Sequence, residues 1–209
     1  MRTRSIAASI FLSAYLVFRP IPANATPIRF VATGVGTGTI GSTAFTDASI
    51  VFTSFGDTNS RFQVPGLSFT VYGIQHTSSS VAIDGLGSFQ VLSQTETFAN
   101  LLSQLVGYSR YSTIVASPTG ADLYNGPTDT AFATWNMLSS IGPINGTGRF
   151  FQWSGGQFPS VITSVGVLNI FDNPNSPATF TATLVPEPST FALAALGAVA
   201  LLAARRRFF

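Results

Sequence analysis

The sequence contains no cysteine and no lysine, and its single histidine is His76. The missing thiols exclude a disulfide framework, a thiolate nucleophile and a cysteine-ligated metal. With one imidazole, a metal site built from several histidines is excluded too. We therefore expect no cofactor, and no metal ligand or catalytic residue among these residue types. Charged residues make up only 9% of the 209 residues, whereas 45% are hydrophobic and 12% are aromatic, which argues against intrinsic disorder.

The excess of positive charge belongs to the two ends of the chain. The whole chain has ten basic and eight acidic residues, and its pI is about 9.4. Residues 26–185 alone contain four arginines and seven acidic residues, a net charge of −3. A mature domain with this charge offers no basic surface, so we expect no nucleic-acid partner.

The first 25 residues read as a signal peptide. Arg2 and Arg4 form a positive n-region, residues 6–18 form an apolar h-region, and Ala23 and Ala25 form a small-x-small cleavage site. The apolar run is shorter than the ~17–25 residues of a membrane-spanning helix, which disfavours an uncleaved anchor. The general secretion machinery and signal peptidase are therefore expected partners.

The C-terminal end carries a second membrane-directed segment. Pro186, Glu187 and Pro188 precede an uncharged apolar run over residues 191–204, and Arg205, Arg206 and Arg207 follow it. At ~1.5 Å per residue the run is shorter than a ~30 Å hydrocarbon core, so it predicts a marginal transmembrane helix suited to a transient anchor. The arginines act as the stop-transfer signal and stay cytoplasmic. A buried C-terminal core helix is the alternative.

This arrangement of a Pro-Glu-Pro motif, an apolar helix and an arginine cluster resembles the PEP-CTERM sorting signal of exported bacterial proteins. The resemblance covers residues 186–207. It implies processing by a membrane-embedded exosortase, with Pro186, Glu187 and Pro188 as the processing motif, and an association with exopolysaccharide production. It further implies export across the inner membrane, a transient membrane anchor, and a final place at the cell surface or in the extracellular matrix.

The region between the ends predicts an all-β domain. It is rich in Thr, Ser, Gly, Val and Phe, and turn-forming residues interrupt it about every eight to twelve residues, as in an antiparallel β-sandwich of jelly-roll-like form. We expect three parts: a signal peptide (1–25), a β-sandwich domain (26–185) and a sorting tail (186–209). Strands are expected at 28–32, 44–55, 67–74, 80–83, 87–92, 111–116, 131–135, 148–153, 161–170 and 178–185.

One segment lacks alternation and predicts a short amphipathic helix. Residues 93–96 fit a capping box, apolar residues follow at helical spacing, and Gly107 stands where a helix would end. We expect this helix over residues 93–107 to cover one open end of the sandwich.

Three groups of residues have spacings or side chains that could serve binding or catalysis. Residues 36–41 fit the G-x-G-x-x-G spacing, but the alternating, β-branched residues that follow favour glycines in a bulge or tight turn over a nucleotide site. His76 is expected at the surface or in loop packing. The clusters that begin at Asp57 and Asp172 fit no EF-hand and favour Asx turns, although calcium binding stays open.

Aromatic and acidic residues leave two further possibilities open. Core packing is the favoured interpretation for the tyrosines and tryptophans, and an exposed sugar-stacking row is the alternative, for residues Tyr108, Tyr111, Tyr124, Trp135 and Trp153. Glycosidic hydrolysis requires two carboxylates, one on either side of the bond, and the seven acidic residues between the ends leave this possibility open, because the sequence does not show their spacing.

The favoured hypothesis is an exported, non-enzymatic structural or adhesive protein of the cell surface or of an exopolysaccharide matrix. The alternatives are a carbohydrate-binding module for exopolysaccharide and, more remotely, a secreted glycan-active enzyme. An exposed row of aromatic rings would favour the module, and a cleft with two carboxylates the enzyme.

Overall fold

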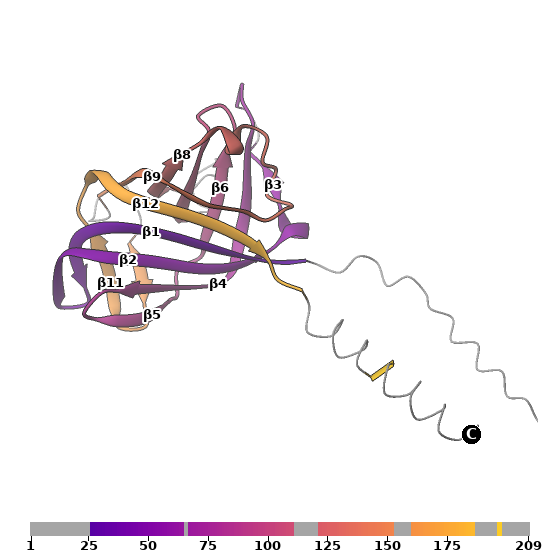
Figure 1. The fold of residues 1–209 in the computed structure, drawn as a ribbon. Coiled ribbons are helices and arrows are strands. Elements are labelled where there is room, and N and C mark those ends of the chain that lie inside the picture. The colour runs from indigo at the N-terminus through magenta and orange to yellow at the C-terminus, as the bar shows by residue number, and fades with distance from the viewer. Residues whose placement is uncertain (1–25, 65–66, 111–120, 153–159, 187–195, 198–209) are drawn as a thin grey trace, which may run out of the picture.

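The computed structural model describes residues 26–64, 67–110, 121–152, 160–186 and 196–197 (Figure 1). Within them lie two short 3-10 helices, η1 (Thr58–Ser60) and η2 (Thr130–Ala133), and twelve strands. The strands are β1 (Pro27–Ile40), β2 (Thr43–Asp57), β3 (Phe62–Gln63), β4 (Val71–Ile83), β5 (Gly87–Val91), β6 (Thr95–Asn100), β7 (Leu105–Arg110), β8 (Ala121–Thr128), β9 (Ile141–Phe150), β10 (Val161–Thr163), β11 (Gly166–Ile170) and β12 (Asn173–Leu184).

Three long neighbouring strands, β1, β2 and β4, form the spine of the domain. β2 pairs with β1 from Asp57 opposite Pro27 to Thr43 opposite Ile40, and its other edge pairs with β4. Along β1 the side chains alternate, since Ile28 and Phe30 are buried whereas Arg29 is exposed. This period of two is the pattern of a strand with one face in the core.

The spine divides at both edges. β1 pairs with β12 through residues 28–33 and with β11 through residues 38–40. β4 pairs with β6 through residues 71–75 and with β5 through residues 79–83. Further strands connect these branches. On one side, β9, β8 and β7 lie between β12 and β6, and on the other side β10 lies between β11 and β5. The sheet therefore closes twice around one spine.

All twelve strands belong to one sheet, and every pairing is antiparallel. The prediction of an all-β antiparallel domain is thus confirmed. Its sandwich or jelly-roll form is not confirmed, because the described strands form one sheet and not two.

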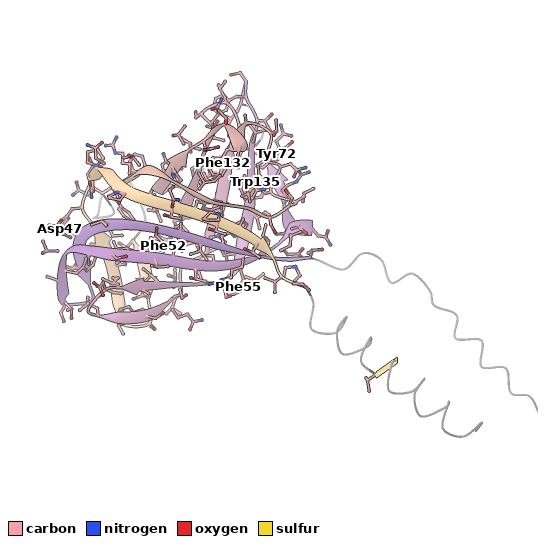
Figure 2. The ribbon with its side chains drawn as sticks, in the orientation of Figure 1. Asp47, Phe52, Phe55, Tyr72, Phe132 and Trp135 are labelled. Carbon is pink, nitrogen blue, oxygen red and sulfur yellow. The ribbon has the colours of Figure 1, made fainter. Side chains whose placement is uncertain are left out.

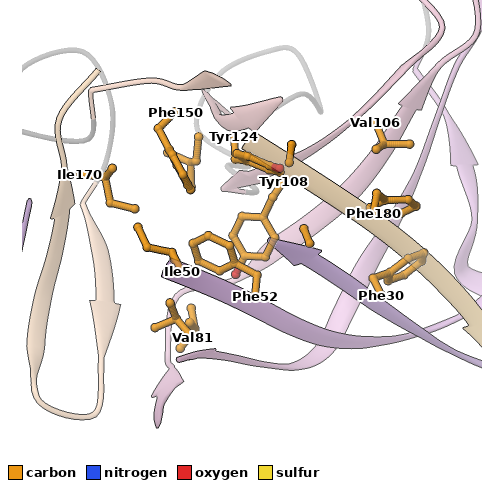
Figure 3. Close-up of a cluster of buried hydrophobic side chains, with 14 of the residues drawn as sticks. Phe30, Ile50, Phe52, Val81, Val106, Tyr108, Tyr124, Phe150, Ile170 and Phe180 are labelled. Atoms are coloured by element: carbon orange, nitrogen blue, oxygen red, sulfur yellow. The ribbon is translucent and has the colours of Figure 1, made fainter. Parts of the chain in front are cut away.

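One hydrophobic core runs inside both closures. Phe52 of the spine stacks on Tyr108 with ring centroids 4.6 Å apart, and Tyr124 packs against Phe150 at 4.8 Å (Figure 3). Ile170 lies at one end of this cluster. The largest side chains in it are almost completely buried, so the core has the burial expected of a stable domain.

The predicted helix over residues 93–107 is wrong. β6 and β7 occupy this segment as a hairpin, joined by a turn at residues 101–104. Both faces of the hairpin are covered: Ala99 and Val106 belong to the main core, and Phe98 packs in a second cluster with Val64. Because the side chains on both faces of these strands are buried, apolar and polar residues do not alternate, and the apolar residues fall at helical spacing.

The predicted strand over residues 131–135 is also wrong. The carboxylate of Asp129 accepts a hydrogen bond from the amide of Ala131 at 2.8 Å and caps η2. Phe132 and Trp135 then fall one 3-10 turn apart, and their side chains lie close together (Figure 2). Both are buried against Phe180 of β12.

No helix in the described ranges is long and apolar enough to cross a membrane. Residues 196–197, in the middle of the predicted anchor, are helical. The rest of the apolar run over residues 191–204 lies outside the residues that the structure describes, as do residues 1–25 and the expected strand at 111–116.

Candidate functional sites

The junction with the C-terminal tail is part of the folded domain. Leu184 ends β12 and pairs with Ile28 of β1. The amide of Val185 donates a 2.7 Å hydrogen bond to the carbonyl of Pro27, and Pro186 follows, exposed and outside any strand. The first and last strands therefore begin and end side by side (Figure 1), and the Pro-Glu-Pro motif starts two residues after the sheet.

Most residues predicted for sorting lie beyond the described part of the chain. Pro186 is placed, as above, at the end of the domain. The others remain predictions: Ala23, Ala25, Glu187, Pro188, Arg205, Arg206 and Arg207.

The glycine-rich and Asx segments have the structural roles that were favoured. The glycine run lies in β1, where the pairing with β2 shifts register between Gly36 and Gly38, and β2 follows it instead of a helix. The carboxylate of Asp57 accepts a hydrogen bond from the amide of Asn59 at 2.7 Å, and the side chain of Asn173 accepts one from the amide of Asn175. Both are Asx turns.

His76 is buried inside the sheet, contrary to the expected surface or loop position. It belongs to β4 and retains 6% exposure, since the spine continues beyond the predicted strand. Its Nδ1 lies 2.8 Å from Oγ1 of Thr95 and its Nε2 lies 2.9 Å from Oγ1 of Thr97. Burial lowers the pKa of His76 to about 3, so the imidazole is neutral at physiological pH.

Hydroxyl groups continue this polar cluster through the core. Ser79 Oγ lies 2.8 Å from both the hydroxyl of Tyr108 and Oγ of Ser54. Burial raises the pKa of Tyr108 to about 12. The partners of His76 are threonine hydroxyls and not a carboxylate, so this cluster lacks the acid of a Ser-His-acid triad. Its members supply hydrogen-bond partners to one another inside the core, at the point where β4 stops pairing with β6 and begins to pair with β5.

A second arrangement brings two carboxylates onto one face. Ser109 of β7 is opposite Glu96 of β6 and opposite Asp122 of β8, so the three side chains form a row across three strands. The hydroxyl of Ser109 donates to Oε1 of Glu96 at 3.1 Å, and Glu96 is 2% exposed. The side chain of Asp122 reaches solvent, yet desolvation by the surrounding protein raises its pKa to about 6.

These carboxylates open into a cavity of about 160 Å³, which we call the acid pocket. Two phenylalanine rings of its wall pack against glycines, Phe62 against Gly73 and Phe98 against Gly107. A Cβ atom on either glycine would collide with the ring. Residues on either side of β4's start, together with β6 and β8, supply the remaining lining. The full lining is Phe62, Val64, Leu67, Phe69, Val71, Glu96, Phe98, Asn100 and Asp122.

No local pattern in the sequence indicates the acid pocket. Glu96 and Asp122 are far apart in the chain. The pattern around Glu96 predicts the capping box of a helix, and this helix does not form. The possibility of two neighbouring carboxylates was open, and strand register decides which two they are. No group of three or more His, Asp or Glu side chains among the described residues is placed to hold a metal ion.

The aromatic residues that the structure describes confirm core packing. Tyr108, Tyr124 and Trp135 are 3%, 1% and 5% exposed, so none of them belongs to a sugar-stacking row. Tyr111 and Trp153 lie outside the described residues.

The comparisons with known proteins bear on the tail. A family model described as the PEP-CTERM protein-sorting motif matches residues 184–207. No curated protein matches the chain. No solved structure matches it either. The match begins at Leu184, the last residue of β12, so the sorting motif and the β domain share a residue.

Proposed function

We propose that this chain, which carries a PEP-CTERM protein-sorting motif over residues 184–207, is exported and sorted by exosortase, and that its β domain is a structural or adhesive component of the cell surface or of an exopolysaccharide matrix. The observation that carries the proposal is the tail junction. The motif continues β12 without a linker, so the domain itself is the cargo that sorting delivers. In this proposal, a signal peptide directs export, the tail anchors the protein transiently in the membrane, and cleavage releases it.

Two features of the domain favour a non-enzymatic role. The single imidazole is buried, is held by two threonines and has a pKa of about 3, so it is unsuited to act as a base at neutral pH. The acid pocket, at about 160 Å³, is smaller than the ~300–1,000 Å³ of usual ligand pockets. A glycosidic bond has a sugar on each side, which this cavity does not accommodate. We therefore favour surface display over glycan hydrolysis.

The first prediction concerns Pro186, Glu187 and Pro188. Replacing all three by alanine removes the two fixed φ angles and allows the tail helix to extend towards the domain, where β12 keeps Leu184 in a strand. A protease that binds an extended substrate then loses its site, so the uncut protein accumulates in the membrane fraction. Mass spectrometry of membrane and surface fractions measures this. Trimming and release like the parent chain would contradict the assigned role.

Replacing Arg205, Arg206 and Arg207 by alanine is the matched comparison. Each arginine opposes passage through the bilayer by about 2.5–3.5 kcal/mol on insertion scales, so its loss weakens the stop-transfer signal. This variant passes through the membrane with its tail intact, in contrast to the membrane-held variant above. If both variants give the same fraction and the same mass, the motif and the arginines do not have separate functions.

A further inference from the structure

The tail leaves the domain at one end of the spine, where β1 begins and β2 and β12 end (Figure 1). The apolar run begins at Phe191, five residues after Pro186, and five residues reach at most about 18 Å. The headgroup layer on one side of a bilayer takes about 5–8 Å of this length. Because the run is shorter than the ~30 Å hydrocarbon core, an anchored tail narrows the remaining gap further. In the proposed function, this end of the domain therefore lies close to the membrane surface.

Two large apolar side chains are exposed at the same end. Phe55, close to the end of β2, is 37% exposed, and Leu138, in the loop before β9, is 42% exposed. Figure 2 shows Phe55 at the end of the domain from which the tail leaves. Leu138 lies on the other side of β12, since the hydroxyl of nearby Ser140 accepts a 2.9 Å hydrogen bond from the amide of Leu184. The two apolar side chains therefore flank the start of the tail.

Basic side chains accompany them. Arg29 of β1 is opposite Phe55, is exposed, and makes no ion pair within the described ranges. Arg61 follows η1 and donates to the carbonyl of Asn136, in the same loop as Leu138. Asp57 also lies here, and its carboxylate caps η1. The two arginines therefore leave this end with an excess of positive charge.

Exposed acidic side chains gather away from the tail. Asp47 donates its amide to Thr37 of β1, and Asp84 donates its amide to Ser49, which is opposite Val35. Asp172 directly precedes β12, and its carboxylate lies 3.0 Å from the guanidinium of Arg149. Residues 35–37 are eight or more positions along β1 from its first residue, which corresponds to about 26 Å or more. This asymmetry of charge favours an approach to anionic lipid with the tail end first.

We propose that, before cleavage, the tail end of the domain contacts the membrane surface, with Phe55 and Leu138 in the headgroup region and Arg29 and Arg61 towards anionic lipid. The inference rests on the proposed function, because it needs the tail as an anchor. Apolar side chains bind in the interface, and basic side chains are attracted to anionic headgroups. So few groups make a weak and reversible contact, which holds the junction at the membrane and releases the domain once the tail is cut.

The absence of cysteine allows a single fluorophore to be attached at a chosen site. Thr183→Cys labels the tail end, opposite Arg29. Thr43→Cys, opposite Ile40, labels an equally exposed threonine at the other end of β1, about 36 Å away. The full chain is reconstituted into vesicles of phosphatidylcholine and phosphatidylglycerol in which part of the lipid carries a nitroxide on its headgroup. Quenching by this nitroxide requires near contact, so we expect loss of fluorescence from residue 183 and none from residue 43.

Flotation of the same vesicles separates the two ways in which this test can fail. A chain that does not float with the vesicles has no anchoring tail, and then the anchoring in the proposed function fails together with the inference. A chain that floats but shows equal fluorescence from the two labels overturns the inference alone.

Variants of the chain labelled at residue 183 decide which side chains make the contact. Phe55→Ser is expected to reduce the quenching, whereas Phe171→Ser, which changes an exposed phenylalanine beside Thr37, leaves it unchanged. Arg29→Gln is expected to lower the ratio of contacting to free domain about fivefold with anionic lipid, and to have no such effect in phosphatidylcholine alone. If Phe55→Ser and Arg29→Gln are both quenched like the parent chain, the proposed contact is wrong.

Discussion

At the scale of single residues, His76 shows how a buried titratable group makes stability depend on pH. The two nitrogens of the imidazole lie against the hydroxyls of Thr95 and Thr97, and Phe30 and Tyr108 pack on the ring. Its pKa is lowered to about 3 in the fold, against about 6.5 in an unfolded chain. Between pH 6.5 and pH 3, His76 is therefore protonated in the unfolded chain and neutral in the folded domain.

We expect His76 to make the domain acid-sensitive. Its contribution to the free energy of unfolding is complete above pH 6.5 and falls by about 1.4 kcal/mol per pH unit as the pH drops towards 3. Urea unfolding at several pH values, compared with His76→Gln, measures this. The comparison cancels Asp122, whose raised pKa acts in the opposite direction and makes the fold lose stability as pH rises through about 6. Parallel pH profiles for parent and variant would refute the assignment.

At the scale of elements, the hairpin of β6 and β7 separates what local pattern can predict from what it cannot. β1 and β2 have one face in the core, so their alternation revealed them. In β6 five consecutive residues are buried, since the inner face meets the core and the outer face meets the segment around Val64. Nothing in residues 93–107 alone indicates that a distant segment covers the outer face.

The same limit applies to the acid pocket. An acidic residue on β6 and another on β8 become neighbours only through Ser109, which pairs with both. Pairing across strands is a property of register, which is set by the whole sheet and by its turns. The tail differs, because its motif, apolar run and arginines are contiguous in sequence, and the family match confirmed it. Local signals were therefore sufficient for sorting and insufficient for the pocket.

A glycine substitution in the turn tests the hairpin directly. Gln104 has φ of 53°, in the left-handed region where non-glycine residues are strained by about 1–2 kcal/mol. Gln104→Gly relieves this strain, and we expect the unfolding free energy to rise by about 1 kcal/mol. In a helix the same change would lower it by about 1 kcal/mol. Chemical unfolding gives the sign, and Gln104→Ala, which keeps a Cβ atom, is the control.

At the scale of the whole molecule, the first and last strands of the domain are hydrogen-bonded to each other. β1 pairs with β12, and the last hydrogen bond of this pairing, from Val185 to Pro27, lies next to the exposed Pro186. The segment that a sorting protease must approach is therefore adjacent to a hydrogen-bonded strand. In the proposed function, the stability of this edge limits how much extended chain a protease can reach.

Val185→Pro tests this edge. It removes the amide that donates to Pro27 at 2.7 Å, and we expect the unfolding free energy to fall by about 1 kcal/mol or more. Val185→Ala keeps the amide and serves as the control for the lost side chain. Equal melting temperatures of the two variants would show that the hydrogen bond does not stabilise the junction.

The pairing of β1 with β12 also sets the order in which the chain folds. In the export that we propose, β1 crosses the membrane early and pairs first with β2, and its other edge stays unpaired until residues 179–184 have followed. Such long-range pairing is slow, and an open strand edge in the meantime invites aggregation. β12 closes this edge, and the sorting motif follows it directly in the chain. In the proposed export, the strand edge of β1 is therefore covered only when the tail reaches the membrane.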